Sequence, residues 1–283
     1  MSIRFCSLAS SSAGNCYYIE SGGGTRILVD AGIPLRRLER TLRSLGVEPE
    51  TLQGIFITHA HRDHIASYLI KRPFATRYGI DSYASTPTWR EMFRAGCGQL
   101  DHSRCHRLYA GQGVVIGDLC ITGYPKLHDA AGALCFTIAS ETERLAIVTD
   151  LGQMTADLLQ ALRGCQYYIF EANHDVEMEQ SSARLWSLKQ RVLGQYGHLS
   201  NEQAADALVH LSHGAKSICL AHLSEECNLP ELASGVVERR LRAAGLEVAV
   251  CSLPARSPSR FYGSCEEPRL EVLSLWGDTA EKA

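Results

Sequence analysis

Short apolar runs, most of them rich in β-branched residues, alternate with amphipathic segments along the whole chain. Six of these runs stop abruptly at a polar cluster: RILVDAG at Asp30, GIFITHAHRDH at His59, ITGYPKLHD at His128, LAIVTDLG at Asp150, YYIFEANHD near Glu171 and SICLAHLS at His222. Runs of this kind are typical of buried strands. Because α/β folds build their sites where strands give way to loops, the polar clusters are the first candidates for functional residues.

The segments between these predicted strands have helical spacing and recognisable ends. Leucines recur along PLRRLERTLRSLG, which Pro34 opens and Gly46 closes. Four further helices are predicted: from Thr86 to Gly96, over 157–163, from a capping box of Ser200 and Gln203 to Gly214, and from about Pro230 to Gly245, before a strand in LEVAVCS. The glycines of ESGGGTR predict a hairpin turn between CYYIE and RILVD.

This pattern predicts a single α/β domain over residues 1–251, with its polar residues gathered at strand ends. From Ser252 the sequence becomes rich in proline and serine, in PARSPSRFYGSCEEPRL. Residues 252–283 are therefore expected to form a C-terminal extension or peripheral tail.

Composition narrows the class of protein. The 283 residues are 45% hydrophobic and 21% charged, which is ordinary for a globular chain with a substantial core. The net charge of −3 gives no global electrostatic argument for binding nucleic acid. We find no secretory signal pattern in MSIRFCSLAS and no apolar run of membrane-spanning length, so no membrane association is expected. Eleven cysteines without a CxxC pair indicate free thiols, and a cytoplasmic location fits best.

The stretch THAHRDH contains four residues of strong metal-ligand type: His59, His61, Asp63 and His64. A catalytic zinc needs only three protein ligands, so the stretch is too rich for one open site. His59 and His61 are two positions apart at the end of a predicted strand, and in an extended chain they point the same way. Asp63 and His64 are adjacent and must diverge. The spacing therefore indicates two groups of ligands facing two neighbouring ions, unlike the HExxH helix, which serves one zinc.

The HxHxDH element, with the polar residues at the other strand ends, resembles the metallo-β-lactamase superfamily. The resemblance implies an αββα sandwich with a dinuclear metal site at the sheet edge. It also implies a ligand set divided between two ions: His59, His61 and His128 for one, Asp63, His64 and His222 for the other, with Asp150 bridging them. Asp30 corresponds to the buried aspartate that orients the histidine loop. Zn²⁺ or Mn²⁺ is expected, with iron also compatible with the mixed imidazole and carboxylate ligands.

Other motifs distinguish branches of this superfamily. A penicillin-degrading zinc enzyme would usually have cysteine at Asp150, and oxygen-reducing diiron relatives have glutamate at His61, so both branches are disfavoured. The order of EANHD, GHLSN and AHLSEECN is similar to that of tRNase Z-like phosphodiesterases. With LASSSAGNCYYIE, these motifs most resemble the YycJ/WalJ group of nuclease-like hydrolases. The lack of an insertion like the tRNA-gripping arm of tRNase Z argues against dedicated tRNA processing.

We therefore expect a metal-dependent phosphodiesterase or nuclease, with exonucleases included, that cleaves DNA or RNA by attack of a metal-bridging hydroxide. Asp63, His198 and Asp30 are expected to serve catalysis, and His198 would reach the phosphate or protonate the leaving oxygen. The expected substrate-binding residues are Ser12, Asn15, Asn173, His174, Asp175 and Ser224. For several of these a plain turn or loop role is the alternative.

Two other functions remain open at this stage. A thioester hydrolase of the glyoxalase II kind would use the same ligand types. A metal-binding partner protein without turnover is the alternative from another class, although the intact ligand set argues against it. The sequence does not decide between DNA and RNA, between exonuclease and endonuclease, or between oligomeric states.

Overall fold

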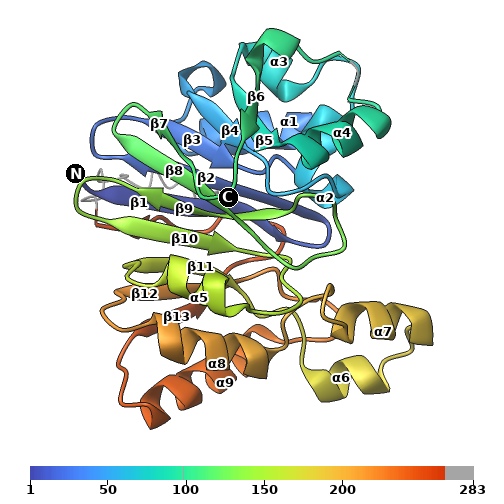
Figure 1. Cartoon of the computed structure of the whole chain (residues 1–283), viewed down its shortest axis with the longest axis vertical. Coiled ribbons are helices and arrows are strands. Elements are labelled where there is room, and N and C mark those ends of the chain that lie inside the picture. The colour runs from blue at the N-terminus through green and yellow to red at the C-terminus, as the bar shows by residue number, and fades with distance from the viewer. Residues whose placement is uncertain (98, 265–283) are drawn as a thin grey trace, which may run out of the picture.

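The computed structural model describes residues 1–97 and 99–264 and has four layers. Two seven-stranded sheets pack face to face, and helices cover the outer face of each sheet (Figure 1). This arrangement confirms the predicted αββα sandwich. Within the described residues, no helix has the length and hydropathy needed to cross a lipid bilayer.

Both sheets combine antiparallel and parallel strands. The first sheet contains, from edge to edge, β14 (Tyr262–Gly263), β1 (Ile3–Ser11), β2 (Gly14–Ser21), β3 (Arg26–Val29), β4 (Gly54–Phe56), β5 (Ser82–Ser85) and β6 (Cys105–Leu108). The second contains β13 (Ala249–Ser252), β12 (Ser217–Ala221), β11 (Tyr167–Glu171), β10 (Arg144–Val148), β9 (Leu134–Ala139), β8 (Leu119–Pro125) and β7 (Gly113–Ile116). Strands β3 to β6 are parallel to one another, as are β10 to β13, so the carboxyl ends within each set share one edge.

The helices divide between the two outer faces. Those that follow strands of the first sheet are α1 (Leu35–Ser44), α2 (Arg62–Ile65), α3 (Phe74–Tyr78) and α4 (Thr86–Arg94). The second sheet is covered by α5 (Ala156–Leu162), α8 (Asn201–Leu211) and α9 (Pro230–Ala243). The remaining pair, α6 (Val176–Ser181) and α7 (Trp186–Leu193), projects from the side of the sandwich (Figure 1).

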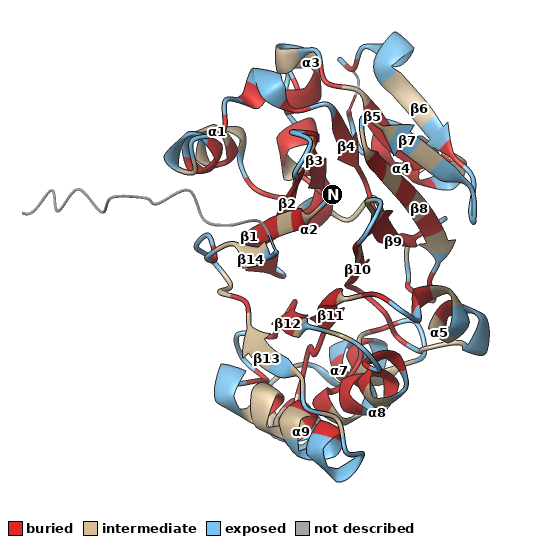
Figure 2. Cartoon of the chain, turned by 90° about the vertical axis from the view of Figure 1, so that its left-hand side faces the viewer, coloured by how far each residue is buried: buried red, intermediate tan, exposed pale blue. Residues whose placement is uncertain are grey.

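Three layers of buried apolar side chains hold the sandwich together. Phe5 and Ile27 from the first sheet meet Ile147 and Ile169 from the second in the central layer. The opposite faces of the same strands pack on the helices, as Leu28 does beside Leu38 of α1. Figure 2 shows the resulting distribution, with buried strands at the centre and exposed residues on the outer surfaces of the helices. Because the inner parallel strands β3, β4, β10, β11 and β12 are covered on both faces, their sequences are continuous apolar runs.

The elements predicted from periodicity are present. The six apolar runs contain β3, β4, β8, β10, β11 and β12, and the predicted helices are α1, α4, α5, α8 and α9. The capping box is formed: the Ser200 hydroxyl accepts from the Gln203 amide, and the Gln203 side chain accepts from the Ser200 amide. The predicted hairpin joins β2 to β3.

The C-terminal segment packs beyond the predicted boundary at residue 251. Strand β13 ends at Ser252, and β14 pairs with β1 at the edge of the first sheet. Between them, the Ala255 carbonyl accepts from the Ser10 amide at 3.1 Å, and Ser259 exchanges hydrogen bonds with Ser7. The chain is therefore part of the sandwich as far as Ser264, and the rest of the predicted extension, 265–283, lies outside the described residues.

Candidate metal centre

The loop between β4 and α2 is fixed by the buried carboxylate of Asp30. Asp30 accepts hydrogen bonds from the amide and the hydroxyl of Thr58, both at 2.8 Å, and from Nδ1 of His64 at 2.7 Å. The Thr58 hydroxyl also lies 2.9 Å from Nδ1 of His59. Asp30 is completely inaccessible to solvent, so it acts on the loop and not on a substrate. This geometry agrees with the orienting role that the resemblance implies.

Three residues of the site have left-handed backbone conformations. Among the described residues, the non-glycine positions with positive φ are Asp30 (60°), Asp150 (54°) and His222 (55°). Each follows directly or one residue after a parallel strand, namely β3, β10 and β12. Conformations of this kind cost on the order of 1–3 kcal/mol each and cluster at functional sites.

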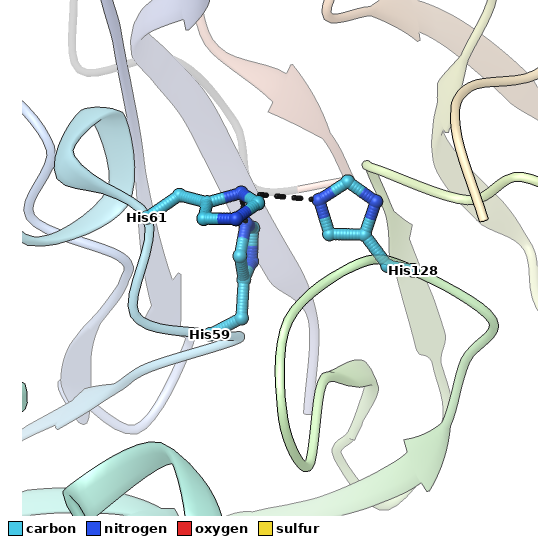
Figure 3. A group of neighbouring side chains, drawn as sticks. All are labelled: His59, His61 and His128. Atoms are coloured by element: carbon cyan, nitrogen blue, oxygen red, sulfur yellow. Dashed lines mark hydrogen bonds between the residues drawn. The ribbon is translucent and has the colours of Figure 1, made fainter. Parts of the chain in front are cut away.

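His59, His61 and His128 form the first group of candidate ligands (Figure 3). Nδ1 of His61 lies 3.0 Å from Nε2 of His59 and 3.2 Å from Nε2 of His128. Three imidazole nitrogens bound to one tetrahedral zinc at about 2.05 Å would be about 3.3 Å apart. The three rings therefore already converge at nearly the spacing that one ion requires.

Asp63, His64, His222 and Asp150 form the second group. Oδ2 of Asp63 lies 3.5 Å from Nε2 of His64 and 3.7 Å from Nε2 of His222, while Oδ2 of Asp150 lies 3.1 Å from Nε2 of His64. Although they lie near these charged neighbours, two of the buried atoms, Nε2 of His222 and Oδ2 of Asp150, make no hydrogen bond of good geometry with the described residues. Buried polar atoms normally have partners, so a bound cation fits this donor set.

Asp150 stands between the two groups. Its Oδ1 lies 3.8 Å from Nε2 of His128 in the first group, and its Oδ2 contacts His64 in the second. A carboxylate in this position can bind one ion with each oxygen. The division of the ligands and the place of Asp150 match the expectation drawn from the resemblance, and their role as ligands remains a proposal.

The histidines of the first group have lowered pKa values, which favour their neutral form. Burial lowers the pKa of His59 well below its usual range and also lowers the pKa of His61. Burial lowers the pKa of His128 to about 4, although the carboxylate of Asp150 opposes the shift. The neutral imidazole is the form that binds a metal, so these three side chains need not lose a proton at neutral pH.

The second group is charge-paired. Burial opposes protonation of His222, but Asp150 and two further carboxylates raise its pKa to about 10. Asp150 and Asp30 likewise raise the pKa of His64 well above its usual value despite burial. The same contacts hold the pKa of Asp63 and of Asp150 below the usual range of a carboxyl. A cation entering this group would therefore replace protons.

Glu171 is a central residue of the site that sequence reasoning did not assign. It is completely buried at the end of β11, and its Oε1 lies 2.9 Å from Nδ1 of both His198 and His222. Its Oε2 accepts from the amide of Leu151 at 2.8 Å. Burial would raise the pKa of Glu171, but His198 and His222 lower it to about 2. The available signal was its position at the end of an apolar run in YYIFEANHD.

His198 lies where the sequence predicted, beside both groups of candidate ligands. Its ring centroid is 5.4 Å from that of His128 and 5.2 Å from that of His222. Its side chain is 15% exposed, whereas those of the neighbouring candidate ligands His128 and His222 are almost fully buried. Glu171 holds Nδ1 of the ring, which leaves Nε2 for another partner.

Asp129 and Arg191 lie beside the first group and were not predicted. Oδ1 of Asp129 is 3.3 Å from Nε2 of His128 and 3.7 Å from Nε2 of His61. Its other oxygen accepts a hydrogen bond from Nε of Arg191. Asp129 follows His128 directly in the sequence, but Arg191 comes from the distant helix α7, so only the fold brings it to the site.

Two of the predicted substrate-binding residues, Asn15 and Asn173, contact candidate ligands, and most of the set are engaged with the protein. Buried Asn15 directs its amide to Asp63 and His64, at 3.3 and 3.0 Å. Three others make hydrogen bonds within the protein: Asn173 donates to the His222 carbonyl, Asp175 caps α6, and Ser224 accepts from the Cys227 amide. His174 is only 1% exposed, whereas Ser12 is exposed in the β1–β2 turn. Contact of these residues with a substrate stays a prediction.

The comparisons with known proteins agree with this geometry. Residues 25–223, which include every candidate ligand, match the family described as "Beta-lactamase superfamily domain". The chain is 35% identical over 249 residues to exodeoxyribonuclease WalJ of Streptococcus pneumoniae, with 87% of this chain and 91% of the relative covered. It is 32% identical over 249 residues to exodeoxyribonuclease YycJ of Bacillus anthracis, with 88% and 92% covered.

A solved structure shares the architecture. The metallo-β-lactamase-fold protein YhfI from Bacillus subtilis superposes with a TM-score of 0.67 at 16% identity and covers 93% of this chain and 100% of that chain. At this identity the likeness concerns the fold alone. With the family match over most of the sequence, it shows that the chain belongs to the β-lactamase superfamily domain family and has the metallo-β-lactamase fold.

Proposed function

We propose that this protein is a two-metal deoxyribonuclease that hydrolyses phosphodiester bonds at or near the ends of DNA strands. The observation that carries the proposal is the pair of adjoining ligand groups joined by the carboxylate of Asp150. Two divalent ions held there would activate a water molecule near neutral pH and neutralise a phosphodiester. Imidazole and carboxylate donors in this mixture suit Zn²⁺ or Mn²⁺.

The side chains around the ligands have distinct roles in this proposal. Asp30 fixes the loop of His59 and His64, and Glu171 fixes the rings of His198 and His222. His198 keeps Nε2 for the substrate, where it binds a phosphate oxygen or delivers a proton to the leaving oxygen. Each of these contacts presents a reacting atom in a fixed orientation before the substrate arrives.

The choice of DNA rests on the relatives. Two proteins that are at least 32% identical to this chain over most of its length carry the name exodeoxyribonuclease. The glyoxalase II-like alternative uses the same ligand types, but the names of these two relatives favour a nuclease. An intact set of ligands also argues against a binding protein without turnover.

One assay separates the candidates. Protein stripped of metal with a chelator is reloaded with Mn²⁺ or Zn²⁺ and incubated with end-labelled single- and double-stranded DNA and RNA, and in parallel with S-lactoylglutathione. We expect DNA to be shortened from its ends, and we expect His59→Ala to abolish the reaction. His102→Ala, which alters an exposed histidine of another surface, serves as the matched control and should retain activity. Thioester cleavage without cleavage of DNA would refute the proposal.

A further inference from the structure

A projecting segment beside the metal centre exposes an unusual concentration of apolar side chains. Residues 176–197, here called the α6–α7 arm, comprise α6, α7 and the loop that leads to His198 (Figure 1). Ten large apolar side chains are exposed among the described residues, and four of them lie on this arm: Leu185, Trp186, Leu188 and Tyr196. Leu185 and Trp186 are 78% and 65% exposed. Such a patch marks a binding surface.

The arm is a fixed platform. The ammonium group of Lys189, although almost buried, donates to the carbonyls of Gln180 and Ser182, both at 2.6 Å. Arg184 bonds the buried carboxylate of Glu179 at 2.8 Å. These contacts tie α7 back to α6, so the backbone that carries the apolar side chains is held in place and the entropic cost of ordering the arm on binding is small.

The arm is also joined directly to the candidate metal centre. Arg191 of α7 bonds Asp129, whose Oδ1 lies 3.3 Å from Nε2 of His128. The amide of Asp129 donates to the Tyr196 carbonyl at 3.1 Å. Trp186 lies about 7–8 Å along the helix axis from Arg191. A polymer bound at the metals would therefore reach Arg191 and Tyr196 first and Trp186 next.

The charge of this segment suits a polyanion. The arm, residues 176–197, contains three basic and two acidic residues, a net charge of +1 within a chain of net charge −3, and the stretch 181–197 has no acidic residue. Within the described part of the chain, Nε is the one nitrogen of the Arg191 guanidinium with a hydrogen-bond partner, which leaves two amino groups for a phosphate. Aromatic rings next to a cation form the usual surface for unpaired bases and their phosphates.

We propose that the α6–α7 arm binds the DNA strand that enters the metal centre. Arg191 binds a phosphate next to the one being hydrolysed, and Tyr196 and Trp186 stack against unpaired bases. The arm therefore favours strands with unpaired ends over blunt duplexes. This inference rests on the proposed nuclease function and assigns it a specificity surface.

The test separates binding from chemistry. Binding of a dye-labelled single-stranded oligonucleotide is followed by fluorescence anisotropy in the presence of a chelator, for the wild type and for Trp186→Ala, Tyr196→Ala and Trp186→Phe. Stacking on an aromatic side chain contributes enough that each alanine variant should weaken binding by about tenfold. Trp186→Phe keeps an aromatic ring and should retain most of the affinity. Arg191→Gln removes one phosphate contact, so the slope of log affinity against log salt concentration should decrease in magnitude by about one.

Hydrolysis assays complete the test. For Trp186→Ala and Tyr196→Ala, the loss of kcat/KM on single-stranded DNA should exceed any loss on bis(p-nitrophenyl) phosphate, a diester without bases, by about tenfold. Val115→Ala, which alters a 70% exposed apolar residue on β7, is the matched control and should behave as wild type. The inference would be overturned if both alanine variants bound the oligonucleotide with wild-type affinity. It would also be overturned if these variants changed their oligomeric state while DNA binding stayed intact. Failure of the wild type to cleave DNA would instead refute the proposed function.

Discussion

Replacing Glu171 by glutamine changes one oxygen of a buried carboxylate into an amide nitrogen, and so tests how the second group of candidate ligands is oriented. In the native protein Oε1 of Glu171 faces Nδ1 of His198 and of His222, at 2.9 Å each. Oε2 accepts from the amide of Leu151 at 2.8 Å. A carboxylate only accepts, so Nδ1 of each ring carries a proton, and at His222 a bound metal would replace the second proton, on Nε2.

Glutamine cannot satisfy all three contacts in this way. Its carbonyl must stay with the Leu151 amide, because that backbone group only donates, so the new amide nitrogen faces both rings. His222 must then accept at Nδ1 and carry its proton on Nε2, the atom that faces Asp63 across 3.7 Å. A protonated Nε2 cannot bind a metal. Partners of this kind are worth about 10- to 100-fold in metal affinity, or about 1.4–2.8 kcal/mol.

The measurement is a competition titration. Metal-free wild type and Glu171→Gln are titrated with Zn²⁺ against a chromophoric chelator, and their free energies of unfolding are measured in urea without metal. Glu143→Gln is the matched control, because Glu143 is also a buried glutamate but bonds the amide of Ile3, Tyr167 and Lys216 at the opposite end of β1. We expect weaker metal binding for Glu171→Gln alone.

Two results would refute this reasoning. Unchanged zinc affinity in a folded Glu171→Gln protein would mean that Glu171 does not set the tautomer of His222. An equal loss of affinity in Glu143→Gln would mean that general destabilisation, and not the contact with His222, weakens the site.

Three further predictions follow from particular contacts. A Cβ on Gly32 would lie 1.6 Å from a backbone oxygen of α2, so Gly32→Ala should displace that helix and weaken zinc binding, measured by the same titration. Gly235→Ala has open space around it within α9 and should leave zinc binding unchanged while raising the free energy of unfolding by about 0.5–1 kcal/mol. The pKa of His222 is about 10 in the metal-free protein, so metal binding should release protons and should become stronger as pH rises through neutrality. Calorimetry in two buffers of different ionisation enthalpy measures the number of protons released. A result of zero would contradict the charge pairing of His222. Burial would raise the pKa of Glu143, but Lys216 and other hydrogen-bond donors lower it to about 2, which is below the pKa of this group in the unfolded chain. The carboxylate of Glu143 therefore contributes fully to stability above about pH 4.5, and this contribution is lost as pH falls toward 2. Urea unfolding of wild type and Glu143→Gln across that range should show a smaller acid dependence in the variant, and identical curves would exclude this residue as the cause.

Much of the fold and of the ligand set could be predicted because both depend on the same strands. The parallel strands β3, β4, β10, β11 and β12 are buried on both faces, so each is a continuous apolar run that stands out in the sequence. Every candidate ligand lies just beyond the carboxyl end of a strand of the sandwich, in a loop or in the short helix α2, where an apolar run gives way to histidine or aspartate. The same short segments therefore contain both the apolar pattern that predicts a strand and the candidate ligands that follow it.

The elements that could not be predicted depend on contacts between distant segments. The edge strands β6 and β7 are half-exposed and carry no strong periodic pattern. Helices α6 and α7 are six and eight residues long, and much of their arrangement comes from bonds such as those of Lys189 to two carbonyls. The contact of Arg191 with Asp129 likewise exists only once α7 lies beside the loop after β8.

Glu171 illustrates a different limit. Its place at the end of an apolar run was visible in the sequence, but its function depends on β11 lying between β10 and β12, which deliver Asp150 and His222 on either side. In that position one carboxylate can hold two imidazoles, and no local pattern contains this information. Sequence reasoning therefore finds polar strand ends readily, and strand order decides which of them meet.

The strained residues show what the fold does for the chemistry. A strand that continues its pleat would send successive side chains to opposite faces of the sheet. At Asp30, Asp150 and His222 the left-handed conformation, with φ between 54° and 60°, turns the chain at the end of the strand instead. Glycine would adopt this conformation without strain, but it has no side chain with which to bind a metal or orient a ligand. Aspartate and histidine tolerate it better than most residues. The buried hydrogen bonds of Asp30 and His222 then hold the side chains across the edge of the sandwich, which places donors from both sheets around one point.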